Sequence, residues 1–478
     1  MAQELITAYL PRPNMIKKID TKRYMIKYEH ISDVLGGSDM TGWTVGATVA
    51  KAARWLTATL VAGLVAATAP ARAVELSLWS PPFFTPGAGL PAMADAYRDL
   101  YARFEAENPG IRIRYEVIPG NVEALRHYLT AAGANNLPDV ALLDASWVAR
   151  LAQTGKLQAL NDLWTAENRA KVLPDAVAMV TIDGRVYSVP FHTSLRALVY
   201  RRDTLASLGF EQPPASWDRF LAYAEAAKAK GLHAIMYPGH GSAHTMLHML
   251  SMFWGLGGEL VDEAGRPVFF EGRSREVLET VYATYRMLVE KGYMPASVGT
   301  MDETGLRPFF YSGENAMSAQ STSSLQQIYA DRPPLQGNLG IMSHPMPGDA
   351  KAKPVLGGWT YGIFASAPDR KQAAWKFVEF VTRPENLGRL NVVHGHLPVL
   401  QAIWDQEPYR SDPLMVATRR ILETHGMRPL PTAPIYPAIA AAWSQQMADV
   451  LSGRTTPARA VENARNQVQA EFRRISNR

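Results

Sequence analysis

Histidine residues recur at regular intervals in one stretch of the chain, where His240, His244 and His248 stand four residues apart. This spacing places side chains near one face of a helix. Imidazole groups arranged in this way can bind zinc when a carboxylate or another ligand completes the site. The stretch contains no His-Glu-x-x-His motif, and the chain contains no cysteine. We therefore expect no metal and no cofactor, with zinc binding as the alternative.

The motifs of several common enzyme classes do not occur in the chain. It has no Gly-x-Ser-x-Gly nucleophile motif, no Gly-x-x-x-x-Gly-Lys-Ser/Thr phosphate loop and no Gly-x-Gly-x-x-Gly dinucleotide fingerprint. Paired carboxylates for glycoside hydrolysis cannot be identified from spacing in one sequence. The pattern predicts a protein that is not an enzyme, with a periplasmic hydrolase as the alternative.

Aromatic rings and small polar side chains occur together where expected strands end. This combination suits sugars and polyols, because a ring can stack on the apolar face of the ligand while polar groups bind its hydroxyls. The first positions of this kind are Trp79, Phe83, Phe84, Asp144, Ser146 and Trp147. Two alternatives are open: the aromatic residues pack in the core, and Asp144 caps a helix.

Strand-like and helical segments alternate along the chain, which predicts an α/β protein. We expect strands at 74–79, 111–118 and 139–143, and helices at 92–108, 122–134 and 146–153. Further along, we expect a strand pair at 180–189 and helical segments at 217–230, 245–253, 274–291, 370–381 and 438–475. Parallel sheets of this kind bind ligands at the carboxyl ends of their strands, so candidate ligand contacts are sought there.

The amino-terminal region has the features of an export signal. The basic residues Lys51 and Arg54 precede an apolar run at 55–67, and a small-x-small cleavage pattern follows at 71–73. The run is shorter than the roughly 20 apolar residues that span a bilayer. We predict cleavage after Ala73 and location in the periplasm, with a membrane anchor or a core helix as the alternative.

An export signal normally lies at the very start of a chain, whereas residues 1–39 are polar and charged. We therefore predict that Met40 is the true start, that residues 1–39 are an upstream extension, and that residues 40–73 form the signal peptide.

The charge of the chain follows the same division. Residues 1–73 hold 9 Lys and Arg against 5 Asp and Glu, whereas the rest of the chain holds nearly equal numbers of the two kinds. A nucleic-acid surface needs clustered basic charge, so no nucleic-acid partner is expected. Without cysteine, disulfides and thiolate metal sites are excluded.

Several segments, taken in order, resemble the family 1 extracellular solute-binding proteins. They are 136–140 (Asn-Leu-Pro-Asp-Val), 183–190 (Asp-Gly-Arg-Val-Tyr-Ser-Val-Pro), 213–218, 313–317 (Gly-Glu-Asn-Ala-Met), 321–324, 357–359 (Gly-Gly-Trp) and the helix around 373–380. The subgroup that the chain resembles most is the glycerol-3-phosphate-binding and sugar-binding periplasmic proteins, through 190–194 (Pro-Phe-His-Thr-Ser), 396–398 and 453–457.

The resemblance implies a two-lobed α/β fold of the type II, maltose-binding-protein-like kind, with hinge strands and a ligand cleft between the lobes. By analogy, lobe 1 would comprise 74–190 with 355–395, and lobe 2 would comprise 191–354 with 396–478. The family's members close on a solute by a hinge motion and deliver it to the transmembrane subunits of an ABC permease. We expect a monomer that binds a carbohydrate-like solute: a sugar, a glycoside, or glycerol-3-phosphate or its diesters.

The resemblance adds further expected ligand contacts, at Thr193, Ser194, Trp254, Ser321, Thr322, Gly358, Trp359, His396 and Tyr436. Trp254 stands where the family tends to present a stacking aromatic, with core packing as its alternative. One departure concerns phosphate. The subgroup uses an arginine near the C-terminal segment, whereas 431–437 has none. A neutral sugar is therefore at least as good a candidate as a phosphorylated glycerol.

Overall fold

The computed structural model describes residues 73–119, 122–240 and 243–476 of the 478-residue chain. The predicted extension at 1–39 and nearly all of the predicted signal peptide at 40–73 lie outside these residues. Within the described part, no helix is both long enough and apolar enough to cross a membrane.

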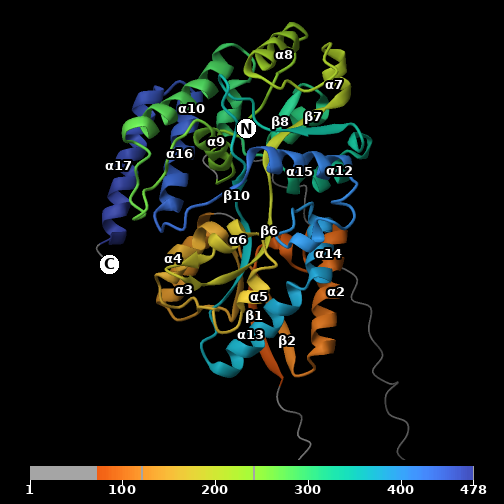
Figure 1. The fold of residues 1–478 in the computed structure, drawn as a ribbon, viewed down its shortest axis with the longest axis vertical. Helices are drawn as coiled ribbons and strands as arrows, with labels where there is room; N and C mark the ends of the chain where they lie inside the picture. The colour runs from red at the N-terminus through yellow and green to blue at the C-terminus, as the bar shows by residue number, and fades with distance from the viewer. Residues whose placement is uncertain (1–72, 120–121, 241–242, 477–478) are drawn as a thin grey trace, which may run out of the picture. The chain divides into compact units, whose positions relative to one another are not determined.

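Strands and helices alternate in the described chain, as the sequence predicts (Figure 1). The strands are β1 (Val74–Ser80), β2 (Ile111–Val117), β3 (Val140–Asp144), β4 (Thr181–Ile182), β5 (Arg185–Val186), β6 (Ser188–Thr193), β7 (Arg196–Arg201), β8 (Met317–Ser321), β9 (Leu339–Met342), β10 (Val355–Leu356), β11 (Gly358–Ile363) and β12 (Arg428–Pro429). The helices from the first half are α2 (Pro91–Glu107), α3 (Val122–Gly133), α4 (Val148–Ala152), α5 (Ala166–Arg169), α6 (Pro174–Ala178), α7 (Arg202–Ser207), α8 (Trp217–Ala229) and α9 (Ala243–Gly255).

The second half is mainly helical. Its α-helices are α10 (Gly272–Glu290), α11 (Arg307–Ser312), α12 (Leu325–Asp331), α13 (Pro368–Val381), α14 (Pro384–His394), α15 (Pro413–His425), α16 (Tyr436–Leu451) and α17 (Pro457–Ser476). Single 3₁₀ turns also occur, including η1 (Pro82–Phe84), η2 (Ala145–Trp147), η3 (Ala296–Thr300), η4 (Thr322–Ser324), η5 (Pro333–Leu335) and η6 (Gln401–Ile403). The expected helical segment at 438–475 is two helices, because the chain turns at Gly453, which has a φ of 75°.

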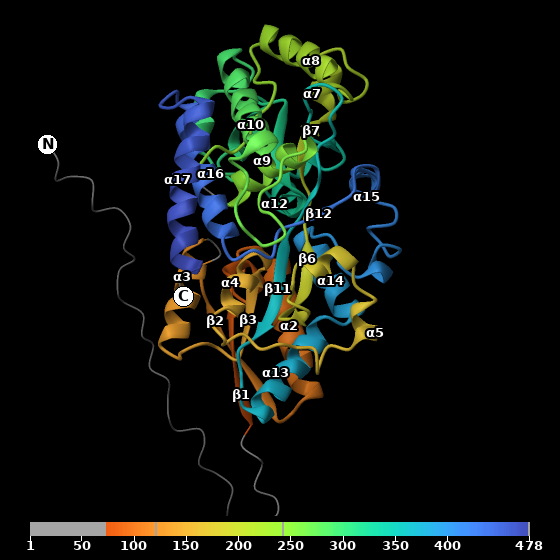
Figure 2. The same cartoon turned by 60° about the vertical axis from the view of Figure 1, so that its left-hand side comes forward.

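The first sheet has the strand order β2-β1-β3-β11-β6. Its strands β1, β2 and β3 run parallel, and β11 pairs antiparallel with both β3 and β6. The carboxyl ends of β1 and β3 therefore lie at one edge of the sheet, where Phe83 follows β1 and Asp144 ends β3. Helices α2 and α13 pack against this sheet, and Figure 2 shows α13 beside β1.

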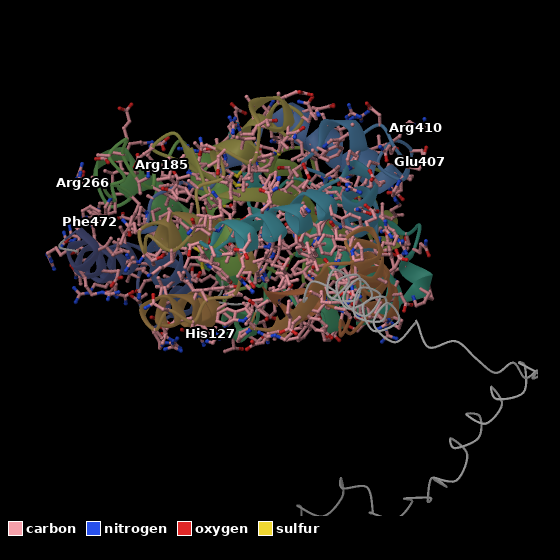
Figure 3. All side chains as sticks on the ribbon, turned by 90° about the horizontal axis from the view of Figure 1, so that it is seen from below. His127, Arg185, Arg266, Glu407, Arg410 and Phe472 are labelled. Atoms are coloured by element: carbon pink, nitrogen blue, oxygen red, sulfur yellow. The ribbon has the colours of Figure 1, made fainter. Side chains whose placement is uncertain are left out.

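The second sheet has three strands in the order β8-β7-β9, and the central strand β7 is antiparallel to both neighbours. Helices α9, α10, α16 and α17 pack around a separate hydrophobic core, in which Trp443 and Tyr282 are fully buried. The two sheets are the centres of the two lobes. Charged side chains such as those of Arg266 and Arg410 project from the outer surface (Figure 3).

The chain passes between the sheets several times, and two of the passages are joined. Thr193 at the end of β6 and Leu397 exchange both backbone hydrogen bonds, Thr193 N to Leu397 O at 3.0 Å and Leu397 N to Thr193 O at 2.9 Å. Beside them, β11 has a register shift between Trp359 and Thr360 where it pairs with β6. These adjacent backbones form the hinge region of the fold.

Candidate functional site

Asp144 ends the central strand β3 and starts the 3₁₀ turn η2. Its Oδ1 accepts hydrogen bonds from the backbone N–H of Ser146 at 2.9 Å and from the Ser146 hydroxyl at 2.6 Å. The side chain therefore caps the turn, which was the alternative interpretation from the sequence. Both residues are half-buried, so both side chains remain within reach of solvent at the edge of the first sheet.

Arg196 lies at the start of β7, on the second lobe, and was not among the predicted site residues. Its Nη1 donates to the hydroxyl of Ser194 at 2.6 Å and to the hydroxyl of Ser321 at 3.0 Å. The Nε of Arg196 is 2.9 Å from Oε1 of Glu303. Arg196 therefore connects two predicted contacts, Ser194 and Ser321, to a carboxylate behind them.

The groups from the two lobes converge. The turn η2 packs against α16, whose first residue is Tyr436. Burial raises the pKa of Asp144, and the neighbouring Arg196 and His244 both lower it. Burial also raises the pKa of Tyr436, which Asp144 raises further and Arg196 lowers. We call Asp144, Ser146, Ser194, Arg196, His244, Ser321 and Tyr436 the interlobe polar group.

Burial and neighbouring charges shift the pKa values of this group. Burial raises the pKa of Asp144, although the two bonds from Ser146 oppose that shift. The interlobe polar group thus presents hydroxyls, a carboxylate, a guanidinium and an imidazole ring.

Three imidazole rings lie in the hinge region, at His192, His394 and His396, and we call them the hinge histidine stack. The rings of His192 and His396 are stacked with centroids 3.4 Å apart and planes 9° apart, and His394 and His396 are 4.9 Å and 4° apart. Phe84 contacts all three rings and also Trp359. Two predicted contacts, Phe84 and His396, therefore lie in ring contacts at the hinge, and their ligand roles stay predictions.

Glycine is required at Gly358. Its φ is 147°, and a Cβ added there would lie 1.9 Å from the backbone oxygen of His192. The two strands β6 and β11 therefore approach each other at a distance that no side chain permits. Next to it, Trp359 is half-buried and has an edge contact with Trp147, with ring centroids 5.7 Å apart.

The structure does not bring Trp254 to the interlobe polar group. Trp254 is ten residues beyond His244 on α9, about 15 Å along the helix axis at 1.5 Å per residue. Its ring is only 5% exposed and is covered by the guanidinium of Arg428 at 4.6 Å. These surroundings fit core packing, the alternative interpretation, and the ligand role of Trp254 stays a prediction.

The remaining predicted residues have mixed surroundings. The indole N–H of Trp79 donates to Glu116 at 3.1 Å, and its ring packs against His127 of α3. Phe83 is 62% exposed, just beyond β1. Thr322 is buried, and its hydroxyl accepts from Leu195 N at 3.2 Å. None of the predicted ligand roles is tested by these positions, and each stays a prediction.

Sequence reasoning missed Arg196 and Glu303. A signal for Arg196 exists, because it opens the apolar run Arg-Ala-Leu-Val-Tyr, and a charged residue at the start of a buried strand needs a partner. No local pattern identifies Glu303 as that partner, since it lies more than 100 residues away in a loop between η3 and α11.

No cluster of three or more His, Asp or Glu side chains suited to a metal ion occurs in residues 73–119, 122–240 and 243–476. Within the histidine pattern, His244 is exposed, whereas His248 is buried with its Nε2 at 3.0 Å from Glu303.

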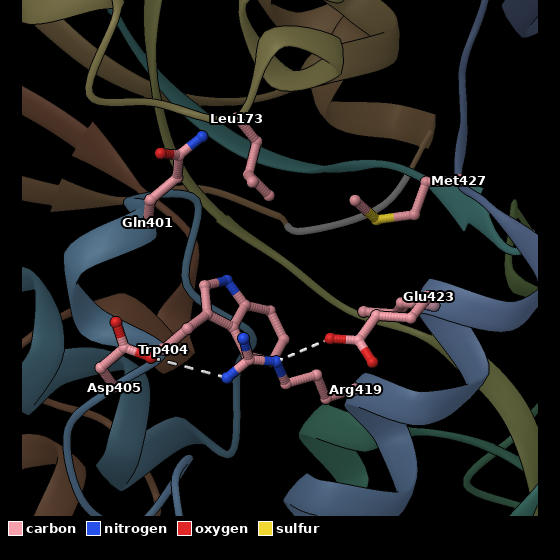
Figure 4. Close-up of a pocket in the computed structure, with 8 residues that line it drawn as sticks. Leu173, Gln401, Trp404, Asp405, Arg419, Glu423 and Met427 are labelled. Carbon is pink, nitrogen blue, oxygen red and sulfur yellow. Dashed lines mark hydrogen bonds and ion pairs between the residues drawn. The ribbon is translucent and has the colours of Figure 1, made fainter.

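Two hollows lie elsewhere on the described surface. One, of about 400 Å³, is between η6 and α15, where Arg419 pairs with Asp405 and Glu423 beside Trp404 (Figure 4). The other, of about 330 Å³, lies beside Trp79 and His127. The residues lining these two hollows include no member of the interlobe polar group.

Comparison with known proteins gives a consistent result. A family model described as bacterial extracellular solute-binding protein matches residues 84–387, more than half of the chain. The sn-glycerol-3-phosphate-binding periplasmic protein UgpB of Shigella dysenteriae is 26% identical over 394 residues, which cover 76% of this chain and 86% of that protein.

Solved structures show the same fold. Maltose-bound MalE3 of T. maritima superposes with a TM-score of 0.71 at 24% identity, covering 83% of this chain and 99% of the other. The GacH receptor of Streptomyces glaucescens, solved unliganded and with acarbose, has a TM-score of 0.71 at 24% identity, covering 84% and 98%. The two-lobed, maltose-binding-protein-like α/β fold predicted from the sequence is thus confirmed.

Proposed function

The chain belongs to the family of bacterial extracellular solute-binding proteins, and from this premise we propose that it captures a carbohydrate-like solute between its lobes for an ABC importer. The observation that carries the proposal is the interlobe polar group, in which side chains from both lobes converge. A solute that bonds to both sides at once favours the closed arrangement, because only that arrangement makes all the contacts.

The chemistry of the group supports a ligand rich in hydroxyls. The oxygens of Ser194 and Ser321 accept from Arg196, so the hydroxyl hydrogen of Ser194 is available to donate to a solute oxygen. Asp144 uses one carboxylate oxygen for Ser146, and its other oxygen can accept from a solute hydroxyl. Half-buried Trp359 offers an aromatic surface nearby.

We propose that the solute contacts are Asp144, Ser146, Ser194, Ser321, Thr322, Trp359 and Tyr436, with Thr193, Gly358 and His396 shaping the hinge beside them. Trp79 and Trp254 act in packing, which their contacts with Glu116 and Arg428 support. We further propose that lobe 1 comprises 74–190 with 355–395 and lobe 2 comprises 191–354 with 396–478.

The relatives that the chain resembles bind maltose, acarbose or sn-glycerol-3-phosphate according to their names. They are named as binding proteins or receptors, which supports the proposal that this chain binds its solute and catalyses no reaction. Secretion to the periplasm after cleavage behind Ala73, a monomeric state and docking on a membrane permease complete the proposal.

A ligand screen tests the function. Purified protein is heated with sugars, glycosides, glycerophosphodiesters or zinc, and the unfolding temperature is recorded. We expect stabilisation by one carbohydrate-like class, together with a decrease in the radius of gyration measured by X-ray scattering when that ligand is added. Stabilisation by zinc alone, or no compaction with any stabilising solute, would refute the proposal.

A further inference from the structure

Beneath the interlobe polar group lies a buried ion pair. The Nε of Arg196 is 2.9 Å from Oε1 of Glu303, and the two side chains are 9% and 4% exposed. Glu303 is in a loop on the second lobe, far in sequence from β7. A buried arginine that keeps its charge needs such a partner, because water cannot solvate it.

Other groups hold the Glu303 carboxylate in place. His248 Nε2 is 3.0 Å from the same Oε1, and His248 in turn contacts His344, whose Nδ1 lies 3.1 Å from the hydroxyl of Tyr237. Gln320 donates to the backbone oxygen of Glu303 at 3.0 Å. Burial would raise the pKa of Glu303, but Arg196, His244 and His248 hold it well below its ordinary value. The carboxylate is therefore ionised and fixed beside Arg196.

The other side of the Arg196 guanidinium faces the solute contacts. Its Nη1 bonds to the hydroxyls of Ser194 and Ser321, and its charge acts on Asp144 and Tyr436. A guanidinium with a free charge in such a position would be a strong receptor for phosphate. Paired with Glu303, it contributes hydrogen-bond donors without net charge.

We propose that Glu303 determines the charge class of the solute: by neutralising Arg196 beneath the site, it makes the site select uncharged, hydroxyl-bearing molecules and reject phosphorylated ones. This inference rests on the proposed function. It separates the chain from its 26%-identical relative named for sn-glycerol-3-phosphate, and it agrees with the lack of an arginine in 431–437.

The test compares uncharged and anionic probes on the wild-type protein and on Glu303→Gln. Maltose and tagatose are the uncharged probes, and sn-glycerol-3-phosphate and inorganic phosphate are the anionic ones, each titrated calorimetrically at fixed ionic strength. In the wild type we expect at least one uncharged probe to bind ten-fold or more tighter than either anion. In Glu303→Gln the Arg196 charge is unmasked, and we expect the affinity ratio to shift at least ten-fold toward the anions.

Two matched variants identify the source of that shift. His248→Gln removes the other neighbour of the carboxylate and leaves both charges, so the ratio should stay at its wild-type value. The double variant Arg196→Met/Glu303→Gln lacks the cation, so the gain for phosphate should disappear. A gain that persists without Arg196, or no gain in folded Glu303→Gln, would overturn the proposal.

The wild-type titration decides the question even where Glu303→Gln fails to fold. Anion binding as tight as that of the best uncharged probe would overturn the charge selection while leaving solute capture intact. Binding of none of the sugars, glycosides or glycerophosphodiesters in the wider ligand screen would instead refute the proposed function.

Discussion

The molecule contains two sets of buried histidines whose surroundings differ. In the second lobe, the rings of His248 and His344 contact each other. His248 also contacts the carboxylate of Glu303, and His344 also contacts the hydroxyl of Tyr237. In the hinge histidine stack, both ring nitrogens of His192 and one each of His394 and His396 are buried without a hydrogen-bond partner in the described structure. One set is a network of connected polar contacts, whereas the rings of the other set are stacked on one another.

The difference shows what each region is built to do. The network surrounds an ionised carboxylate and keeps a cation in position, so its polar bonds have a defined arrangement. The stack favours neutral rings, first because burial lowers the pKa values of His192 and His396, and second because the nearby positive charge of Arg196 lowers them further. Phe84 and Tyr97 contribute rings to its surroundings and no negative charge.

Acid should produce the largest effect, through the stack. Burial lowers the pKa of His192 and His396 well below the ordinary value and that of His394 to about 3. The unfolded chain binds protons from about pH 6.5 downward while the folded chain does not, so stability falls as pH falls below 6.5. By pH 5.5 the three rings together should cost about 4 kcal/mol relative to pH 8. Urea unfolding at both pH values measures this loss, and a flat profile would contradict it.

Removing one partner from the network should have the next largest effect. Glu303→Gln leaves the buried Arg196 charge without its carboxylate, which should lower the free energy of unfolding by about 3 kcal/mol at pH 7. Replacing both charges, as in Arg196→Met/Glu303→Gln, should cost less than the single change. Chemical unfolding of the two variants side by side measures this, and a larger loss in the double variant would show that the pair is not coupled.

A single ring of the stack can be made insensitive to acid. His396→Phe retains an aromatic ring in contact with His192 and Phe84 but cannot be protonated. At pH 5.5 it should recover about 1.4 kcal/mol of the acid-induced loss, the share of one group. The control is the same comparison at pH 8, where the variant should show no such gain. An equal effect at both pH values would attribute the change to packing.

The smallest effect should come from the outer end of the network. Tyr237→Phe removes the hydroxyl 3.1 Å from His344 Nδ1 and leaves the ring in place. A loss of about 1 kcal/mol is expected at pH 8, the typical contribution of one buried hydrogen bond. Thermal unfolding compared with the wild type suffices to detect it, and no loss at all would mean that the hydroxyl finds another partner.

Much of the fold could be predicted from local patterns. The alternation at 111–118 identified β2, and the run 139–143 identified β3 to within one residue. Asp183 and Gly184 marked a hairpin, and both have positive φ, at 49° and 74°. The sequence could not predict that the first sheet combines parallel and antiparallel strands, because the antiparallel strand β11 lies more than 200 residues after β3 in the chain.

The candidate site was predicted less completely. Asp144, Ser194 and Ser321 converge because strand ends meet at sheet edges, which is a rule that sequence reasoning can use. Glu303 lies in a loop with no periodic pattern, so its pairing with Arg196 depends on tertiary structure alone. Trp254 illustrates the opposite case: an aromatic residue in a glycine-rich context suggested a ligand contact, and the helix carries it into the core.

The position of β11 between β3 and β6 determines when the first sheet can be completed as the chain is synthesised. The first sheet cannot be completed until residue 363 is available for pairing, so a growing chain that stops before Gly358 leaves two strand edges open. Such distant pairing slows folding, since a long loop must close before the contacts form. The chain therefore stays open at this sheet for longer after synthesis than a chain whose strands pair with their sequence neighbours.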